Sequence, residues 1–274
     1  MHIARIPILL DNLKGITQTA SGANHTLALD SKGQIFVWGN GQQNQLGYRT
    51  IERHQHKSLT PYPLRLGRRR FTTIGNGTDH SFAIDNQNNV WSWGANSMGM
   101  TGHRTGAGDD NASIYIPGKI ESLKRPNDPI TQITGGAHHS IAVTQSGSCL
   151  VWGEIKAHQL GLDVSTVPED DIIFDSKGEP GIVIEPTMVP QVTGTKFVAA
   201  GTDHNIALNG SDESFSWGFS LMYQTGQGVT DEVKMPTKIE NTAVRGKKIT
   251  WAGAGGQYSM LAGPADVDVE MGDA

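Results

Sequence analysis

The chain has 274 residues, enough for one large hydrophobic core or for two domains of ordinary size. It contains 34 glycines while only 18% of its residues are charged, and this balance favours short strands and tight turns over helices. The net charge of -5 excludes a molecule that is basic throughout. Its single cysteine, Cys149, excludes an intrachain disulfide framework, and we expect it to be a small buried core residue because its neighbours are apolar.

No membrane span or signal peptide is visible in the first fifteen residues, and we expect neither. The apolar stretch from Ile6 to Leu10 is interrupted by Pro7 and is far shorter than the ~20 residues that a span needs. We therefore expect an intracellular protein without a membrane partner. Residues 4–10 are similar to residues 115–120, which close one unit of a repeat described next. Residues 1–15 are accordingly predicted to contain the end strand of a preceding unit.

From residue 16 onward the chain repeats itself. A word with glycine three residues before histidine occurs four times, and thirteen residues after each histidine comes a Trp-Gly pair. Nine residues after each tryptophan comes another glycine. The histidines are His25, His80, His139 and His204, the tryptophans are Trp38, Trp93, Trp152 and Trp217, and the later glycines are Gly47, Gly102, Gly161 and Gly226. A fifth, altered word ends at Tyr258.

Each unit contains the signals of four short antiparallel strands. Apolar and small residues alternate after the histidine, as in residues 26–29, which is the pattern of a half-buried strand. A turn rich in glycine and asparagine follows, then a second strand ending in Trp-Gly, a variable loop, and a short strand with a proline. Four such strands make one blade of a β-propeller, and blades bury their faces by stacking on one another. We expect the tryptophans to fill the interfaces between blades.

The predicted organisation follows from these anchors. The repeats cover residues 16–70, 71–129, 130–194 and 195–247, with a partial fifth repeat at 248–262 and an acidic, disordered tail at 263–274. The third repeat contains a long insertion, residues 162–190, which we expect to pack partly ordered beside its blade. Two architectures compete: an open arc of a larger ring, and a closed four-bladed ring. We expect the arc, because the shape of a blade is matched to the size of its ring.

These words carry a family resemblance. Gly-x-x-His, the Trp-Gly pair and the Gln-Leu-Gly triplets at 45–47 and 159–161 resemble the repeat of the regulator of chromosome condensation family, over Ile16 to Leu261. The resemblance implies an all-β, seven-bladed propeller with four-stranded blades, of which this chain would form an incomplete ring. It also implies a nuclear protein that engages the small GTPase Ran, loosens its bound nucleotide and associates with chromatin through histones and nucleosomal DNA.

Exchange of this kind makes no covalent bond, so the resemblance implies no enzyme chemistry, no cofactor, no metal and no small-molecule substrate. The segments 215–218, 223–226 and 255–257 resemble the C-terminal end of the exchange factors in the family. The alternative is a propeller that serves as a protein–protein adaptor without exchange activity.

The resemblance also implies which residues contact the GTPase, namely those just before the repeat histidine. Carried over, they are Asn24, Asp79, His138, Asp203 and Gln257. Two positions depart from the family pattern: Asn24 stands where an acid is usual, and Tyr258 stands where histidine is usual. The repeat histidines themselves recur once per blade, so we expect each to bond a turn backbone rather than to bind a metal.

A basic stretch has two interpretations. Its residues could form a solvated charged surface, or they could contact DNA phosphates and acidic histone surfaces, which pair well with guanidinium groups. The candidate chromatin-binding residues are Arg49, Arg53, Lys57, Arg68, Arg69 and Arg70.

Overall fold

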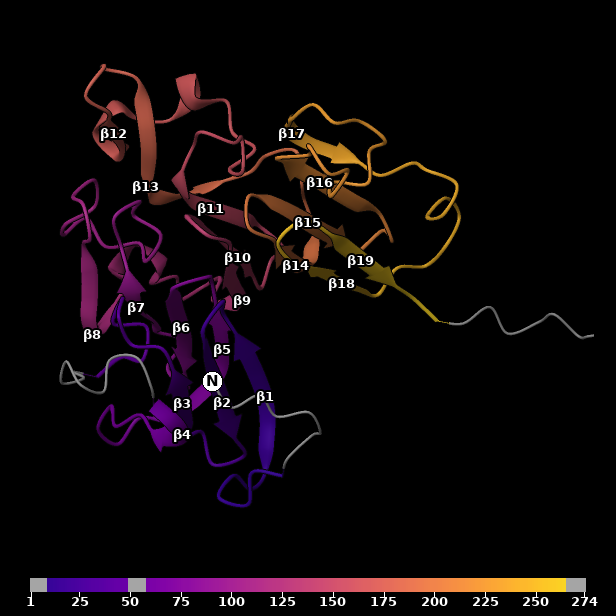
Figure 1. Ribbon diagram of the computed structural model, residues 1–274. Coiled ribbons are helices and arrows are strands. Elements are labelled where there is room, and N and C mark those ends of the chain that lie inside the picture. Colours follow the sequence, from indigo (N-terminus) through magenta and orange to yellow (C-terminus); the bar gives the residue numbers. More distant parts are fainter. Residues whose placement is uncertain (1–8, 49–57, 265–274) are drawn as a thin grey trace, which may run out of the picture.

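The computed structural model describes residues 9–48 and 58–264, and these form five antiparallel sheets that follow one another around an axis (Figure 1). The first blade contains β1 (Ile16–Ser21), β2 (His25–Asp30), β3 (Ile35–Gly39) and β4 (Ser58–Pro63). The second contains β5 (Phe71–Asn76), β6 (His80–Asp85), β7 (Val90–Ala95) and β8 (Ser113–Lys119). In both, each strand pairs with the next along the chain.

The third blade contains β9 (Ile130–Gly135), β10 (His139–Thr144), β11 (Cys149–Glu154) and β13 (Pro180–Met188), with β12 (Ile172–Phe174) added outside β13. The fourth contains β14 (Thr195–Ala200), β15 (His204–Asn209), β16 (Ser214–Gly218) and β17 (Val233–Lys238). The fifth sheet consists of β18 (Trp251–Ala254) and β19 (Ser259–Ala262). The only helices in the described ranges are short 3₁₀ turns: η2 (Glu121–Leu123), η3 (Val164–Thr166) and η4 (Glu169–Asp171).

The blades form an open arc. Figure 1 shows the first blade and the fifth sheet separated by open space, with the other blades leading from one to the other. The all-β propeller fold is therefore confirmed, and the closed four-bladed ring was the wrong alternative. None of the described residues forms a helix long and apolar enough to cross a membrane.

The second strand of a blade is more buried than its alternation predicts. Every residue of β6 and of β10 is buried, on both faces of the sheet. The period-two pattern predicts a half-buried strand, but stacking covers each blade from both sides, so small residues such as Ala83 and Ala142 are buried with their larger neighbours. Cys149 is also fully buried, as predicted, and burial raises the pKa of its thiol to about 12.

The hairpin turns after the second strands are held by side chains. Asp30 Oδ1 accepts the backbone N–H groups of Lys32 and Gln34 at 2.9 and 2.8 Å. Asp85 Oδ1 does the same for Gln87 and Asn89 at 2.9 and 3.0 Å. In this way the carboxylate accepts backbone N–H groups of the turn, which cannot pair with a neighbouring strand where the chain reverses.

The insertion in the third repeat is ordered by its neighbour. Its hairpin, β12 with β13, packs on the long loop of the second blade, where a Cβ at Gly99 would meet Ile184 at 2.8 Å. Arg104 of that loop contacts Asp171 at 2.6 Å and Glu185 at 3.1 Å and donates to the Asp170 carbonyl at 2.9 Å. The insertion is therefore a bridge between two blades.

Because neighbouring strands are antiparallel, each blade has two distinct ends. One end, which we call the loop rim, carries the connections from first to second strand (22–24, 77–79, 136–138, 201–203 and 255–258) and the loops from third to fourth strand. The other end, the turn rim, carries the hairpin turns from second to third strand and the linkers between blades (64–70, 120–129, 189–194 and 239–250). The two rims offer separate surfaces to partners.

Candidate interaction surface

The five residues predicted to contact a GTPase lie on the loop rim, one in each sheet. Each directly precedes the first residue of a second strand, or its counterpart Tyr258 in the fifth sheet. Asn24, His138 and Gln257 are exposed, while Asp79 and Asp203 are half-buried. The repeat therefore arranges them as a row along the arc, which we call the rim row.

The glycine of each Trp-Gly pair fixes the backbone of the rim row. The Asp79 carbonyl accepts the N–H of Ala95 at 2.9 Å, and the His138 carbonyl accepts that of Glu154 at the same distance. Gly94, which directly precedes Ala95, has a φ of +104°, and a Cβ on Gly94 would be 2.5 Å from the Asp79 carbonyl oxygen. Only glycine allows this approach, so the Trp-Gly pair positions the neighbouring rim residue.

His138 is the centre of a charged cluster. Its Nδ1 lies 3.0 Å from Glu154 Oε2, and this hydrogen bond raises the pKa of His138, with further contributions from the charges of Glu154, Asp203 and Asp79. The same bond lowers the pKa of Glu154, whose side chain is only 14% exposed. The Asp79 and Asp203 carboxyls have raised pKa values because burial disfavours their charged forms, an effect that His138 opposes.

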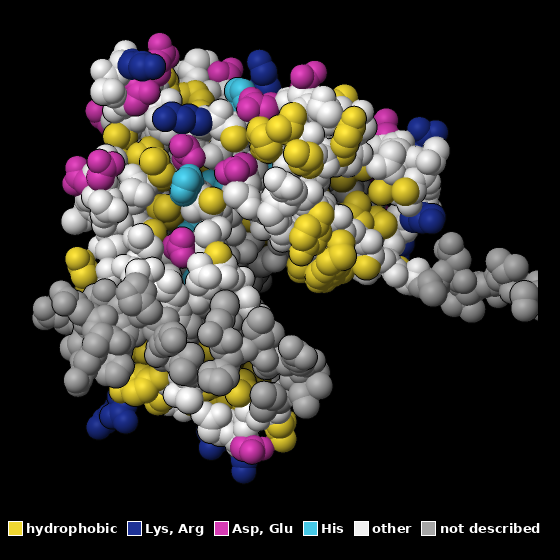
Figure 2. Space-filling model, in the orientation of Figure 1, with side chains coloured by type: hydrophobic (Ala, Val, Ile, Leu, Met, Phe, Trp, Pro, Cys, Tyr) yellow, Lys and Arg dark blue, Asp and Glu magenta, His cyan; other side chains and the backbone are white. Residues whose placement is uncertain are grey.

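The cluster therefore consists of the His138 imidazole, which gains a proton readily, and the carboxyl groups of Glu154, Asp79 and Asp203. Figure 2 shows acidic side chains gathered around a histidine on this face of the molecule. Such a surface suits a partner with basic and hydrogen-bonding groups, because charge complementarity speeds encounter and fixes register.

Sequence reasoning missed three residues that shape the cluster. Glu154, which directly follows a Trp-Gly pair, holds His138. Gln45 Nε2 donates to Asp79 Oδ1 at 3.3 Å, and Gln159 Nε2 donates to Glu154 Oε2 at 3.4 Å. Both glutamines are buried, and their Oε1 atoms accept backbone N–H groups within their own loops. The sequence did contain a signal for Gln45 and Gln159, because each begins one of the repeated Gln-Leu-Gly triplets.

The repeat histidines have a structural role, but the expected partner was wrong. Each Nε2 bonds a side chain of the next sheet instead of a turn backbone. The pairs are His25–Ser81 at 2.8 Å, His80–Ser140 at 2.9 Å, His139–Asn205 at 2.9 Å and His204–Ser259 at 2.8 Å. The reason is that the second strand is buried against the neighbouring blade, which brings that partner within reach.

Each of these bonds continues to a loop carbonyl of the earlier blade. The Ser81 hydroxyl donates to the Gln45 carbonyl at 3.1 Å, so the serine proton is already used and His25 Nε2–H must be the donor in their pair. The other partners do the same: Ser140 to Met100 at 2.8 Å, Asn205 to Gln159 at 2.7 Å and Ser259 to Gln224 at 2.7 Å. Each repeat histidine is thus the donor through its Nε2–H.

Burial favours the neutral form of these histidines. Desolvation lowers the pKa of His25, His139 and His204 to about 4 and that of His80 to about 3. Each histidine has its own partner in a different sheet. Among the described residues no three His, Cys, Asp or Glu side chains are grouped so as to hold a metal ion.

Three of the four repeat tryptophans fill blade interfaces, as predicted, whereas Trp38 of the first blade is only half-buried. These three are fully buried, and each donates its indole N–H to the same carbonyl that the partner side chain contacts. The bonds run from Trp93 to Gln45 at 2.8 Å, from Trp152 to Met100 at 2.9 Å and from Trp217 to Gln159 at 3.0 Å. We call this set of tryptophan, histidine, polar side chain and carbonyl the blade joint.

The described arginines of the basic stretch lie away from the rim row. Arg68, Arg69 and Arg70 are exposed in the linker between the first two blades, on the turn rim. Arg69 lies 4.4 Å above the ring of Trp91, and Arg70 Nε donates to the Lys32 carbonyl at 3.1 Å. The other three candidates, Arg49, Arg53 and Lys57, lie outside the described residues.

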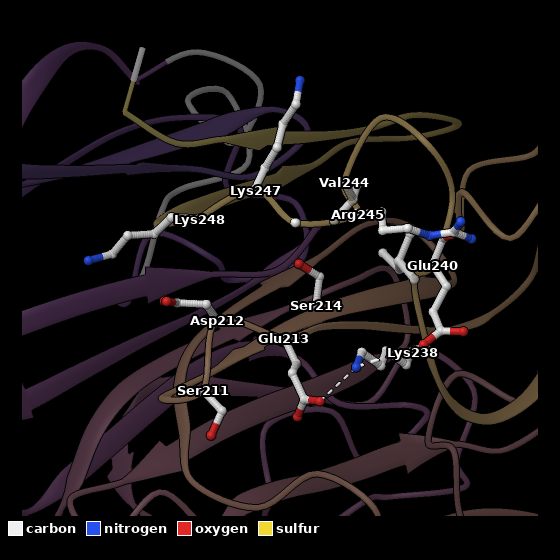
Figure 3. Close-up of a pocket in the computed structure, with 12 residues that line it drawn as sticks. Ser211, Asp212, Glu213, Ser214, Lys238, Glu240, Val244, Arg245, Lys247 and Lys248 are labelled. Atoms are coloured by element: carbon white, nitrogen blue, oxygen red, sulfur yellow. Dashed lines mark hydrogen bonds and ion pairs between the residues drawn. The ribbon is translucent and has the colours of Figure 1, made fainter. Parts of the chain in front are cut away.

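A cavity of about 430 Å³ opens on the turn rim of the fourth blade (Figure 3). Its buried Ser214 takes the place that Ile35 and Val90 fill in earlier blades, and the Ser214 hydroxyl has no hydrogen-bond partner. The ion pair Lys238–Glu213, at 2.8 Å, lies at its wall. Figure 3 shows the ammonium groups of Lys247 and Lys248 pointing away from the cavity. The charged side chains around the cavity therefore do not converge on it.

The fold defines a β-propeller domain. The chain belongs to the RCC1-like domain family, whose model matches residues 2–261. Protein pim1 of Schizosaccharomyces pombe is 39% identical over 92% of this chain and 46% of its own length. Guanine nucleotide exchange factor SRM1 of Saccharomyces cerevisiae is 36% identical over 93% of this chain and 52% of its own length.

The arrangement of the blades is similar to that in a solved yeast structure. Prp20p from Saccharomyces cerevisiae, described with its binding properties to Gsp1p and histones, superposes with a TM-score of 0.83 and 36% identity over 90% of this chain and 55% of its own. The human E3 ubiquitin-protein ligase HERC2 is 30% identical over 97% of this chain but only 5% of its own length. The chain spans about half the length of the curated exchange-factor relatives it matches.

Proposed function

We propose that this chain is a Ran-binding portion of a guanine-nucleotide exchange factor and that the rim row is its contact surface. The supporting observation is the cluster of Asp79, His138 and Asp203 on one rim, in a chain 36% identical to an exchange factor over 93% of its length. The yeast structural relative is described with Gsp1p, which is Ran in yeast.

The proposed activity needs no covalent step. An exchange factor binds the nucleotide-free GTPase more tightly than the nucleotide-bound form, and this differential affinity weakens nucleotide binding. The rim row would supply charged and hydrogen-bonding contacts to that complex. No cofactor, metal or small-molecule substrate enters the proposal.

The test combines binding with nucleotide release. Ran loaded with fluorescent GDP is mixed with the chain, and release is followed by fluorescence while binding is measured by titration. Faster release supports exchange by this portion alone. Binding without release supports a portion that binds but needs further contacts to expel nucleotide. If neither occurs, the adaptor alternative is favoured.

Variants locate the surface. Asp79→Asn together with Asp203→Asn is expected to weaken Ran binding about tenfold or more and to slow association most at low salt, because charges at the rim of an interface mainly affect encounter. Asp212→Asn is the matched control, since Asp212 is an exposed acid on the turn rim. Equal losses in the two variants would place the contact elsewhere.

We further propose chromatin association through the basic candidates Arg49, Arg53, Lys57, Arg68, Arg69 and Arg70, and nuclear localisation with it. Histones are named in the description of the yeast relative, and Arg68 is exposed on the rim opposite the row.

The chromatin proposal has its own measurement. We expect a combined variant to weaken nucleosome binding and to flatten its dependence on salt; it carries Arg49→Ala, Arg53→Ala, Lys57→Ala and Arg68→Ala. The reason is that binding releases fewer counterions from the DNA for each phosphate contact that is lost. Arg69 and Arg70 are kept because they contact the protein itself. Unchanged affinity and salt slope would remove these residues from the proposal.

A further inference from the structure

Each of the four blades builds the same turn in the loop after its Trp-Gly pair. The middle residue of the turn donates its N–H to the carbonyl three residues before it and accepts the N–H of the glycine three residues after it. These middle residues are Asn44, Gly99, His158 and Tyr223. The residue that directly follows is buried in every blade and is Gln45, Met100, Gln159 or Gln224. The turn therefore forms both with a glutamine and with a methionine at this place.

The backbone carbonyl at this position belongs to the blade joint. Met100 accepts the Ser140 hydroxyl at 2.8 Å and the Trp152 indole N–H at 2.9 Å. The carbonyls of Gln45 and Gln159 make the equivalent bonds. The joint between the second and third blades is thus complete with a methionine, so the amide of a glutamine here is not needed to hold two blades together.

The side chain of Gln45 connects its turn with the rim row. Its Oε1 accepts the Gln43 N–H at 2.8 Å, and its Nε2 donates to Oδ1 of Asp79, in the next blade, at 3.3 Å. Burial raises the pKa of the Asp79 carboxyl, and a donor to the carboxylate opposes this because it favours the charged form. Gln45 therefore both orients this carboxylate and favours its ionised state.

The side chain of Gln159 reaches the rim row through one intermediate. Its Oε1 accepts the Ala157 N–H at 2.7 Å, and its Nε2 donates to Glu154 Oε2 at 3.4 Å. The same oxygen of Glu154 lies 3.0 Å from His138 Nδ1. Gln159 therefore supports the residue that holds His138.

We propose that Gln45 and Gln159 are positioning residues of the rim row, whose buried amides hold Asp79 and Glu154 in the orientation in which the row meets the GTPase. The inference rests on the proposed function. Neither glutamine contacts the partner itself, because both are buried. Since the backbone of each glutamine is part of a blade joint, the rim groups are fixed relative to the core of the propeller. Groups that are already ordered lose less entropy on binding.

The test variants are Gln45→Met and Gln159→Met, which introduce the residue that the second blade already has at this position. Methionine is close to glutamine in length and leaves the backbone carbonyl in place, so both variants are expected to fold and to keep their blade joints. Each is expected to weaken Ran binding about three- to tenfold, since one hydrogen bond that orders a rim group is lost. Titration with Ran measures the loss, and urea unfolding checks the fold.

Gln224→Met is the matched control. Gln224 Oε1 accepts the Met222 N–H at 2.8 Å, so the turn of the fourth blade loses the same bond as the other turns. The rim residue of the next sheet is Gln257, which is uncharged. Gln224→Met is therefore expected to bind Ran as the parent chain does.

A double-mutant cycle separates positioning from a purely structural effect. When Asp79→Ala has removed the carboxylate that Gln45 holds, Gln45→Met is expected to cost no further affinity for Ran. A structural effect of Gln45→Met on the loop would weaken binding by the same factor with and without Asp79.

Two results would overturn this inference while the proposed function stands. The first is binding of Ran by Gln45→Met or Gln159→Met as tight as by Gln224→Met. The second is an equal loss for Gln45→Met in the parent chain and in the Asp79→Ala background. Absence of Ran binding by the parent chain is a different failure, since it would overturn the proposed function itself and this inference with it.

Discussion

His138 and His139 are neighbours in the chain but belong to opposite regions of the molecule. His139 is fully buried in a blade joint, where desolvation lowers its pKa to about 4. His138 is exposed on the loop rim, where Glu154 and two aspartates raise its pKa. Successive residues of an extended chain point to opposite sides, so these two neighbouring histidines lie in different surroundings. As a result the pKa of one is raised and the pKa of the other is lowered.

The same contrast separates the two regions as a whole. The joints use residues that recur from blade to blade, because every blade meets its neighbour in the same way. The rim row varies from blade to blade, with Asn24, Asp79, His138, Asp203 and Gln257 at equivalent places, so that only aspartate recurs. Internal repetition therefore marks what builds the propeller, and variation at a repeated position marks the surface that distinguishes one blade from another.

The largest expected difference concerns two tryptophans on neighbouring blades. Trp152 is fully buried in a joint, so Trp152→Ala is expected to cost about 3–5 kcal/mol of unfolding free energy. Trp91 is half-buried and has Arg69 above its ring, so Trp91→Ala is expected to cost about 1 kcal/mol. Urea unfolding measures both. Similar losses would mean that the joints are not the main source of stability.

The second expected effect is on the pH dependence of stability. His139 has a folded pKa of about 4, below its unfolded value near 6.5, so the unfolded chain binds more protons between these values. The contribution of neutral His139 is present above pH 6.5 and is lost as the pH falls toward 4. We expect His139→Gln, although less stable itself, to lose less stability than the parent chain between pH 7 and pH 5.

His138 provides the opposite control. Its folded pKa is raised, so its contribution is present below the unfolded value near 6.5 and is lost as the pH rises through the folded value. His138→Gln is therefore expected to steepen the loss of stability toward low pH. Urea midpoints at the two pH values give the comparison. A shift of the same sign in both variants would contradict the assignment of these two environments.

The strand pattern and the blade interfaces could be predicted because both follow from repetition. A word that returns with fixed spacing requires each blade to meet the next at equivalent residues, so the burial of Trp93, Trp152 and Trp217 followed from the sequence. The open arc was predicted too, because the shape of each blade is matched to a larger ring.

The side-chain partners that could not be predicted from the sequence depend on contacts between blades. The partner of each repeat histidine is 55 to 66 residues away, and no local pattern contains it. The docking of the insertion through Arg104 joins residues 67 and 81 positions apart. In the rim row, His138 was found by resemblance, but its partner Glu154 comes from the end of another strand and was missed.

A smaller effect is expected at the bridge between the second and third blades. Arg104 is 52% exposed, so Arg104→Ala is expected to cost less than about 1 kcal/mol of global stability. The loss falls on the insertion, because the same side chain holds Asp171 and Glu185. Hydrogen exchange in residues 162–180 is expected to quicken while β10 stays protected. Uniform change across the blade would show that the insertion is held by its apolar contacts.

The smallest expected effect is confined to one proton on the loop rim. Because the hydrogen bond that His138 donates to Glu154 is the main cause of the raised pKa of His138, Glu154→Gln is expected to lower that pKa toward its ordinary value without changing the stability of the joints. Titration of the His138 ring signals by NMR measures the shift, and Asp203→Asn serves as the comparison, since Asp203 acts only through its charge. A larger fall in Asp203→Asn than in Glu154→Gln would mean that the field of the whole rim, rather than the single bond, governs His138. In that case the approach of a charged partner anywhere along the rim row would change the pKa of His138. The variants at Asp79 and Asp203 that test Ran binding would then also change the protonation of His138.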